Sequence, residues 1–205
     1  MHEVLLINAS PRATSTGMRL AREMVDHLTH RYQSVRITRR DLTEHPLLPV
    51  DSDYATALTQ RTPADHPVFG QSEQLIAEVE RCDALVVATP MHNFTVPASL
   101  KLWIDNVVRI GRTFEATPAG KVGLLVDRPV YLVVSSGGFH RGPEARQPDF
   151  LSDYLAHVLH SIGLGDTRFV YLQGLVRGPD AVAAEYARAR RELACHAPFA
   201  EWATV

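Results

Sequence analysis

Val4-Leu5-Leu6-Ile7-Asn8-Ala9-Ser10-Pro11-Arg12-Ala13-Thr14-Ser15-Thr16-Gly17 is the stretch of sequence that decides the fold. Its first four residues form an apolar run that stops at a turn over residues 8–11, which predicts a short buried strand. Apolar residues at helical spacing come next, at Met18, Leu20, Ala21, Met24, Val25 and Leu28. A strand, a loop and a helix therefore follow one another in that order.

The rest of the chain repeats this alternation. We predict a half-exposed edge strand at residues 34–40, near-continuous apolar strands at 83–88 and 130–134, and a fifth strand at 167–172. Helical spacing predicts helices at residues 72–82, 98–109, 150–162 and 180–196. Residues 42–68 carry four prolines and form a long excursion, with a short helix near residues 54–58. Such alternation predicts one α/β domain over residues 1–205, with a parallel sheet covered by helices on both faces.

The composition is that of a folded globular protein. The 205 residues are 45% apolar and 21% charged, and their formal net charge is −2. Basic residues are scattered, so we expect no nucleic-acid partner. No apolar run is long enough to span a membrane, and the N-terminus has no secretory signal pattern. Two isolated cysteines, Cys82 and Cys195, favour a reducing compartment, so we expect a cytoplasmic protein.

The loop after the first predicted strand has the features of a phosphate site. Ser10, Ser15 and Thr16 supply hydroxyl groups and Gly17 follows them at the start of a helix, where free N–H groups and the helix dipole attract anions. The loop lacks the Gly-rich dinucleotide motif and the Gly-Lys-Ser/Thr ending of a P-loop. Ser15 and Thr16 have a plainer interpretation as N-caps of the helix.

Two further loops follow buried strands and should meet the first at one edge of the sheet, where ligands bind. The loop over Pro90, Met91, His92, Asn93 and Phe94 offers an apolar, an amide and an aromatic side chain to a flat ring. In the loop over Ser135, Ser136, Gly137 and Gly138, the glycines let the backbone approach a ligand closely. Taken singly, either loop could be an ordinary turn.

Residues 90–114, Pro-Met-His-Asn-Phe-Thr-Val-Pro-Ala-Ser-Leu-Lys-Leu-Trp-Ile-Asp-Asn-Val-Val-Arg-Ile-Gly-Arg-Thr-Phe, add a family resemblance. They resemble the signature of the FMN-dependent NAD(P)H azoreductases, which are also quinone oxidoreductases of the flavodoxin-like superfamily. The resemblance implies a flavodoxin-like three-layer sandwich with strand order 2-1-3-4-5. It also implies that Ser10, Ser15, Thr16 and Gly17 surround the FMN phosphate, residues 91–94 line the isoalloxazine, and residues 135–138 meet its pyrimidine edge. Members often carry a serine at the position of Gly17, a tyrosine at His92, and an arginine or other residue at Ser136.

The resemblance also implies the chemistry. NADH or NADPH delivers hydride to flavin N5 and leaves, and a quinone, azo or nitroaromatic compound then takes its place, which gives ping-pong kinetics. The first candidates to stabilise the reduced flavin are the N–H groups of Gly137 and Gly138, and the second candidate is His140. A homodimer is implied, with Phe114, Phe139 and the 42–68 segment near the acceptor.

Two rival functions remain open at this point. A flavodoxin-type electron carrier is disfavoured by the charge of −2, because such carriers tend to be strongly acidic. A non-flavin hydrolase or binding module is disfavoured because no Gly-x-Ser-x-Gly nucleophile motif occurs.

No metal site is expected, because the pairs His27/His30 and His157/His160 lack further ligands. Trp103 is expected to pack in a core or interface.

Overall fold

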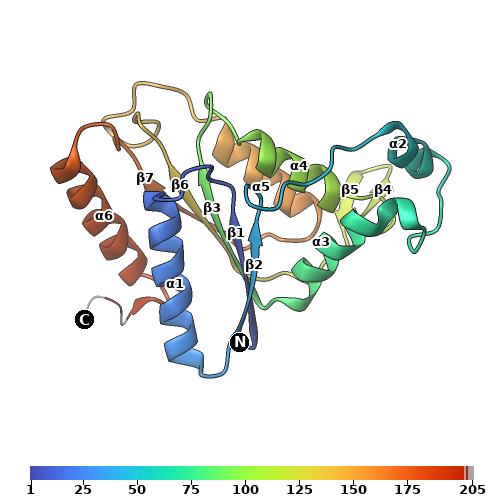
Figure 1. The fold of residues 1–205 in the computed structure, drawn as a ribbon, viewed down its shortest axis with the longest axis horizontal. Helices are drawn as coiled ribbons and strands as arrows, with labels where there is room; N and C mark the ends of the chain where they lie inside the picture. Colours follow the sequence, from blue (N-terminus) through green and yellow to red (C-terminus); the bar gives the residue numbers. More distant parts are fainter. Residues whose placement is uncertain (201, 203–205) are drawn as a thin grey trace.

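A five-stranded parallel sheet forms the centre of the molecule in the computed structural model, which describes residues 1–200 and 202 (Figure 1). Its strands are β1 (Glu3–Asn8), β2 (Arg36–Asp41), β3 (Ala84–Pro90), β6 (Val130–Ser135) and β7 (Thr167–Leu172), in the order β2-β1-β3-β6-β7. All four strand pairs are parallel. The carboxyl ends of these strands therefore meet at one edge, and the α/β fold with a five-stranded parallel sheet is confirmed.

Helices cover both faces of the sheet (Figure 1). One face carries α1 (Thr16–Tyr32) and α6 (Pro179–Ala194), and the other carries α3 (Gly70–Arg81), α4 (Ala98–Val107) and α5 (Leu151–Ser161). Successive strand residues point to opposite faces, so in β1 Val4 and Leu6 join the core beneath α1, whereas Leu5 and Ile7 join the core beneath α3 and α4. Trp103 is buried in the second of these cores.

The segment between β2 and α3 contains the short helix α2 (Ser52–Thr59), followed by a turn of 3₁₀ helix at Pro67–Phe69. Asp51 caps α2 by accepting a hydrogen bond from the Tyr54 N–H at 2.8 Å. Tyr54, Ala57 and Phe69 form a small apolar cluster of their own. This part of the predicted excursion therefore has ordered structure of its own, and the short helix expected near residues 54–58 is present.

A two-stranded antiparallel hairpin of β4 (Phe114–Thr117) and β5 (Gly120–Gly123) was not predicted. Its strands have four residues each and are mostly exposed, so they show neither an apolar run nor alternation. Because this hairpin was missed, the predicted order 2-1-3-4-5 counted only five strands, whereas the fourth and fifth strands of the sheet are β6 and β7. The second strand was predicted to begin at Ser34, which is two residues too early. Ser34 has a φ of 61° and lies in a bend, so β2 begins at Arg36.

The chain beyond α6 returns to the sheet. Phe199 is fully buried, with its ring 5.2 Å from that of Tyr131.

Both cysteines are free. Cys82 is buried, and burial raises the pKa of its thiol to about 11 because it penalises the thiolate. Cys195 is exposed. Within residues 1–200 and 202, no helix has the length and apolar character that crossing a membrane requires.

Candidate functional site

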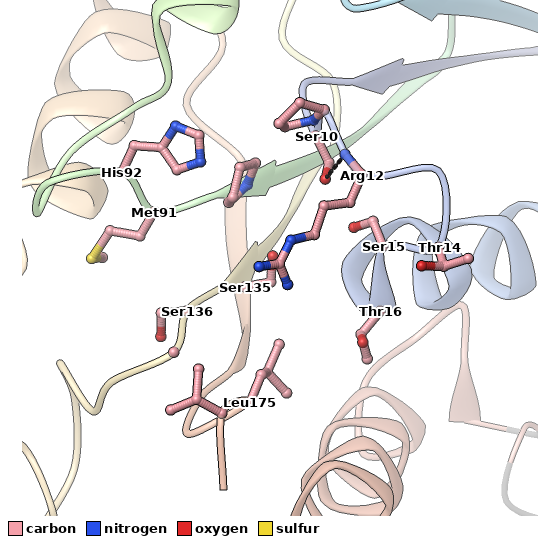
Figure 2. A pocket seen from close by; sticks show the side chains of 14 residues that line it. Ser10, Arg12, Thr14, Ser15, Thr16, Met91, His92, Ser135, Ser136 and Leu175 are labelled. Atoms are coloured by element: carbon pink, nitrogen blue, oxygen red, sulfur yellow. Dashed lines mark hydrogen bonds between the residues drawn. The ribbon is translucent and has the colours of Figure 1, made fainter. Parts of the chain in front are cut away.

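A cleft of about 230 Å³ opens at the carboxyl edge of the sheet (Figure 2). Four strands contribute to it through the loops that follow β1, β3, β6 and β7. Nine of the predicted binding residues line it: Ser10, Ser15, Thr16, Pro90, Met91, His92, Ser135, Ser136 and Gly137. The three loops singled out from the sequence do therefore converge on one cavity.

The hydroxyl groups of the loop after β1 are held by the backbone and still have a proton to donate. Ser10 Oγ accepts a hydrogen bond from the Arg12 N–H at 3.3 Å, and Ser15 Oγ accepts one from the Met18 N–H at 3.3 Å. Ser15 is thus the N-cap of α1, as the plainer interpretation required. Because a hydroxyl both accepts and donates, each oxygen can fix the loop and donate its own proton into the cleft.

Arg12 supplies positive charge to the same cavity. Its side chain extends from the loop after β1 into the cleft, between Ser15 and Ser135 (Figure 2). Within the described part of the chain its guanidinium has no hydrogen-bond or ion-pair partner. A cation without a carboxylate partner beside a helix N-terminus favours an anionic ligand.

The loop after β3 makes a tight turn beside the cleft. His92 and Thr95 exchange two backbone hydrogen bonds, of 2.9 and 3.0 Å, around Asn93 and Phe94. Asn93 and Phe94 have φ of 47° and 71°, a conformation that non-glycine residues seldom adopt and that is concentrated at functional sites. The Phe94 carbonyl accepts a hydrogen bond from the Phe150 N–H at 3.1 Å, which ties this turn to the loop after β6.

The loop after β6 presents backbone donors. Within the described residues, the N–H groups of Gly137 and Gly138 have no acceptor, whereas the Ser136 N–H is bound to the Leu172 carbonyl at 2.8 Å. A Cβ atom on Gly138 would lie 2.7 Å from Gln147 Oε1, so a larger residue would displace that side chain. Two free N–H groups in succession suit the oxygens and ring nitrogens of a heterocycle.

A polar network anchors the remainder of this loop. Asp149 accepts hydrogen bonds from Tyr171 Oη at 2.8 Å and from Arg141 Nε at 2.8 Å, and it also pairs with the Ser152 hydroxyl. Burial alone would raise the pKa of Asp149, but these hydrogen bonds hold it well below its ordinary value. Burial likewise raises the pKa of Tyr171 well above its ordinary value. Asp149 is therefore a fixed anion that fastens the loop to α5 and β7.

His140 takes part in this anchoring. Its Nδ1 lies 2.8 Å from the Pro148 carbonyl, its N–H donates to Gln173 Oε1 at 2.8 Å, and its ring meets that of Phe94 at 6.2 Å. It does not line the cleft. In a single chain, His140 is thus positioned to support the loop and the Phe94 turn.

Several other predicted residues lie outside the lining of the cleft, namely Gly17, Asn93, Phe94, Gly138, Phe114 and Phe139. Gly17 lies in the first turn of α1, where a Cβ atom would be 3.3 Å from Ser135 Oγ, so the glycine lets α1 pack closely against β6. Phe139 packs on Gly174 and under the Arg177 guanidinium, 4.4 Å from the ring centre. Phe114 is 8% exposed and begins β4.

Five lining residues were not among the predicted binding residues: Pro11, Arg12, Thr14, Leu175 and Val176. Leu175 and Val176 belong to the loop after β7, and Val176 is 78% exposed. The rule that ligands bind at the carboxyl ends of parallel strands applies to this loop as well. The predicted strand at residues 167–172 was therefore a signal that could have found them.

Comparison with known proteins identifies the family. The sequence model of a flavodoxin-like fold family matches residues 2–197. FMN-dependent NADH:quinone oxidoreductase 4 of Pseudomonas fluorescens is 58% identical over 200 residues, which cover 97% of each chain. The chain belongs to the flavodoxin-like family of FMN-dependent NADH:quinone oxidoreductases. FMN-dependent NADH:quinone oxidoreductase 5 of Burkholderia lata is 50% identical over 205 residues, 100% of this chain and 98% of that relative.

Solved structures agree on the fold of this FMN-dependent NADH:quinone oxidoreductase family. An azoreductase from Bacillus anthracis superposes with a TM-score of 0.81 at 23% identity, over 94% of this chain and 96% of that one. A second Bacillus anthracis structure, an FMN-dependent NADH-azoreductase in complex with FMN, superposes with a TM-score of 0.77 at 22% identity, over 94% of this chain and 97% of that one.

Among residues 1–200 and 202 no three His, Cys, Asp or Glu side chains form a group able to hold a metal ion.

Proposed function

We propose that this protein is an FMN-dependent NADH:quinone oxidoreductase. The observation that carries the proposal is the cleft itself, which brings hydroxyl groups, an arginine, backbone N–H donors and apolar side chains together at the carboxyl edge of the sheet. The curated relatives with 58% and 50% identity are named for this activity. The whole chain, residues 1–205, would form the one domain that carries it.

The lining residues fit FMN in three parts. Ser10, Ser15, Thr16 and Arg12 would hold the phosphate, because they offer hydroxyl protons and a charge at a helix N-terminus. Pro90, Met91 and His92 would line the isoalloxazine, with Asn93 and Phe94 shaping the turn. Ser135, Ser136 and the Gly137 N–H would meet the pyrimidine edge, where reduction places negative charge, together with the N–H of Gly138, which follows the lining residues in the chain.

The substrates follow from the cofactor. When bound, FMN supplies two-electron hydride chemistry between a nicotinamide donor and a quinone or azo acceptor. A single open cleft would admit donor and acceptor one after the other, so we expect ping-pong kinetics. NADH is the donor named for the curated relatives, and we propose it here ahead of NADPH.

We further propose a homodimer. Phe114 lies away from the cleft of its own chain, and Phe94 beside the cleft is 41% exposed, so a partner subunit would be needed to cover the acceptor position. His140, which braces the Phe94 turn, would act on the site from outside the flavin contacts. The two free thiols, Cys82 and Cys195, fit a reducing compartment such as the cytoplasm.

Reduction of the purified protein tests the proposal directly. We expect a yellow protein, or one that becomes yellow with added FMN, that NADH bleaches anaerobically and a benzoquinone recolours. Double-reciprocal plots of the steady-state rate against NADH concentration, recorded at several quinone concentrations, should be parallel, as a ping-pong mechanism requires. An electron carrier would bind FMN but oxidise NADH very slowly, and a protein that cannot be loaded with FMN would refute the proposal.

A further inference from the structure

The loop that would hold the phosphate is tied to a carboxylate on the neighbouring strand. Asn8 and Asp41 are the last residues of β1 and β2, and they lie opposite each other in the parallel register. Asn8 Nδ2 donates to Asp41 Oδ2 at 2.7 Å. On its other side, Asn8 Oδ1 accepts a hydrogen bond from the Ser10 N–H at 3.0 Å. The Asn8 amide thus links Asp41 to the main chain of Ser10.

Asp41 is itself fixed by donors on its second oxygen. Asp41 Oδ1 accepts hydrogen bonds from the Thr43 N–H at 2.9 Å, the Thr43 hydroxyl at 2.7 Å and the Glu44 N–H at 3.0 Å. Burial would raise its pKa, but the hydrogen bonds from Asn8, Glu44 and Thr43 lower it to about 2. Asp41 is therefore an anion at neutral pH, and its remaining oxygen can only accept.

This arrangement determines which way the Asn8 amide points. An amide has one accepting side and one donating side. Asp41 takes the donating side, so the oxygen must face the Ser10 N–H. Asn8 and Ser10 are 8% and 5% exposed, so a wrongly oriented amide would leave buried donors facing each other.

We propose that Asp41 and Asn8 form a positioning pair that holds the loop after β1 in the conformation that binds phosphate. Neither side chain lines the cleft, so the pair acts through Ser10 and the Arg12 N–H that follows it. The inference rests on the proposed function, because the phosphate is that of FMN.

Three variants test the pair by exchanging its chemistry. In Asp41→Asn, the side-chain oxygen remains with the three donors of residues 43 and 44, so an NH₂ group faces the Asn8 NH₂. The Asn8 amide then either keeps two donors opposed or turns round and opposes the Ser10 N–H. In Asn8→Asp, two carboxylates face each other. In the exchange variant N8D/D41N, the carboxylate at position 8 accepts from both Ser10 and the new amide, so the polarity is satisfied again.

The measurement compares FMN with riboflavin, which lacks the phosphate. Fluorescence titration of the apoprotein should show that each single variant weakens FMN binding by about tenfold while riboflavin changes by less than about twofold. The exchange variant should recover most of the loss, so that its effect is smaller than the sum of the two single effects. Equal losses for FMN and riboflavin, or additive losses in the exchange variant, would overturn the proposal.

Tryptic cleavage after Arg12 supplies a second measurement that needs no flavin. Arg12 is exposed in the loop after β1, so loosening Ser10 should speed the cut between Arg12 and Ala13 in the single variants. The exchange variant should be cut at the wild-type rate. Cleavage after Arg61, in the segment between α2 and α3, should not change and serves as the control. Faster cleavage at both sites would indicate general destabilisation and contradict a positioning role. If the variants showed this cleavage pattern but the wild-type protein bound no FMN, the proposed function alone would be refuted.

Discussion

Arg12→Gln removes the positive charge from the proposed phosphate site while keeping a shorter polar side chain. Of the described residues that line the cleft, Arg12 is the only lysine or arginine. Within the described residues its guanidinium pairs with nothing, so the substitution breaks no internal contact. We expect weaker binding of FMN, unchanged binding of riboflavin and an unchanged free energy of unfolding of the apoprotein.

The size of the effect follows from the exposure of the site. Two unit charges 4 Å apart attract by about 1 kcal/mol in water and about 4 kcal/mol near a protein surface. A phosphate monoester carries about −1.5 to −2 charges at pH 7, and a hydrogen bond to a charged group contributes about 1.5–3 kcal/mol. Because Arg12 is exposed and the cleft is open to water, we take about 2 kcal/mol, which corresponds to roughly a thirtyfold weaker affinity.

Ionic strength separates the charge from other effects of the substitution. The Debye length falls from about 10 Å at 0.1 M salt to about 3 Å at 1 M. Wild-type affinity for FMN should therefore fall with added salt more steeply than that of Arg12→Gln, and riboflavin binding should respond little in either. Arg22→Gln, at an exposed position of α1 outside the cleft, is the matched control. FMN affinity within twofold of wild type at low salt, or an equal loss for riboflavin, would refute the reasoning.

Three further substitutions test contacts that stabilise the fold. Arg109 is 2% exposed and bonds to Glu73 and to the Ser72 hydroxyl. Because Glu73 keeps Arg112 as a partner, Arg109→Met should cost about 2 kcal/mol in urea unfolding, and a loss below about 1 kcal/mol would contradict its role. Asp149 has a lowered pKa, so its charge stabilises the fold above the unfolded pKa of about 3.9 and this contribution is lost as pH falls from about 5. Asp149→Asn should therefore have a lower free energy of unfolding than the wild type at pH 7, and this free energy should fall less as the pH is lowered. Parallel curves of unfolding free energy against pH for the two proteins would contradict this role of Asp149. Phe199→Ala should cost about 3–5 kcal/mol because the ring is fully buried, whereas Phe150→Ala, at a 62% exposed ring, should stay within about 0.5 kcal/mol.

The parallel sheet was predictable because its strands are buried on both faces. Val4 to Ile7 and the apolar run before Thr89 have no polar interruption, which is typical of central parallel strands. Strand ends could be located because polar or turn residues follow each run. The sheet rule then placed three loops at one edge, and the structure brings these loops together. Periodicity and one topological rule were sufficient for this part of the site.

Features held by single side chains could not be predicted in the same way. The β4–β5 hairpin has no apolar pattern, so it was missed. The short helix expected near residues 54–58 is present as α2, but its cap by Asp51 and its three-residue apolar cluster were not predicted. The anchoring of the 136–150 loop depends on Asp149 meeting Tyr171, which lies 22 residues later on another strand. Contacts between residues far apart in sequence leave no periodic signal, so they required the structure.

The loop after β1 shows why a capping role and a binding role should not be treated as alternatives. From the sequence, Ser15 was either an N-cap or a phosphate ligand. The structure shows that its oxygen accepts the Met18 N–H and that it lines the cleft. A hydroxyl that has accepted from a helix N–H has a more polarised O–H bond, so its donation to an anion is strengthened. Ser10 makes the same arrangement with the Arg12 N–H. The hydrogen bonds that fix this loop therefore prepare its hydroxyl groups to bind phosphate, and removing either acceptor role would weaken the ligand contact as well as the loop.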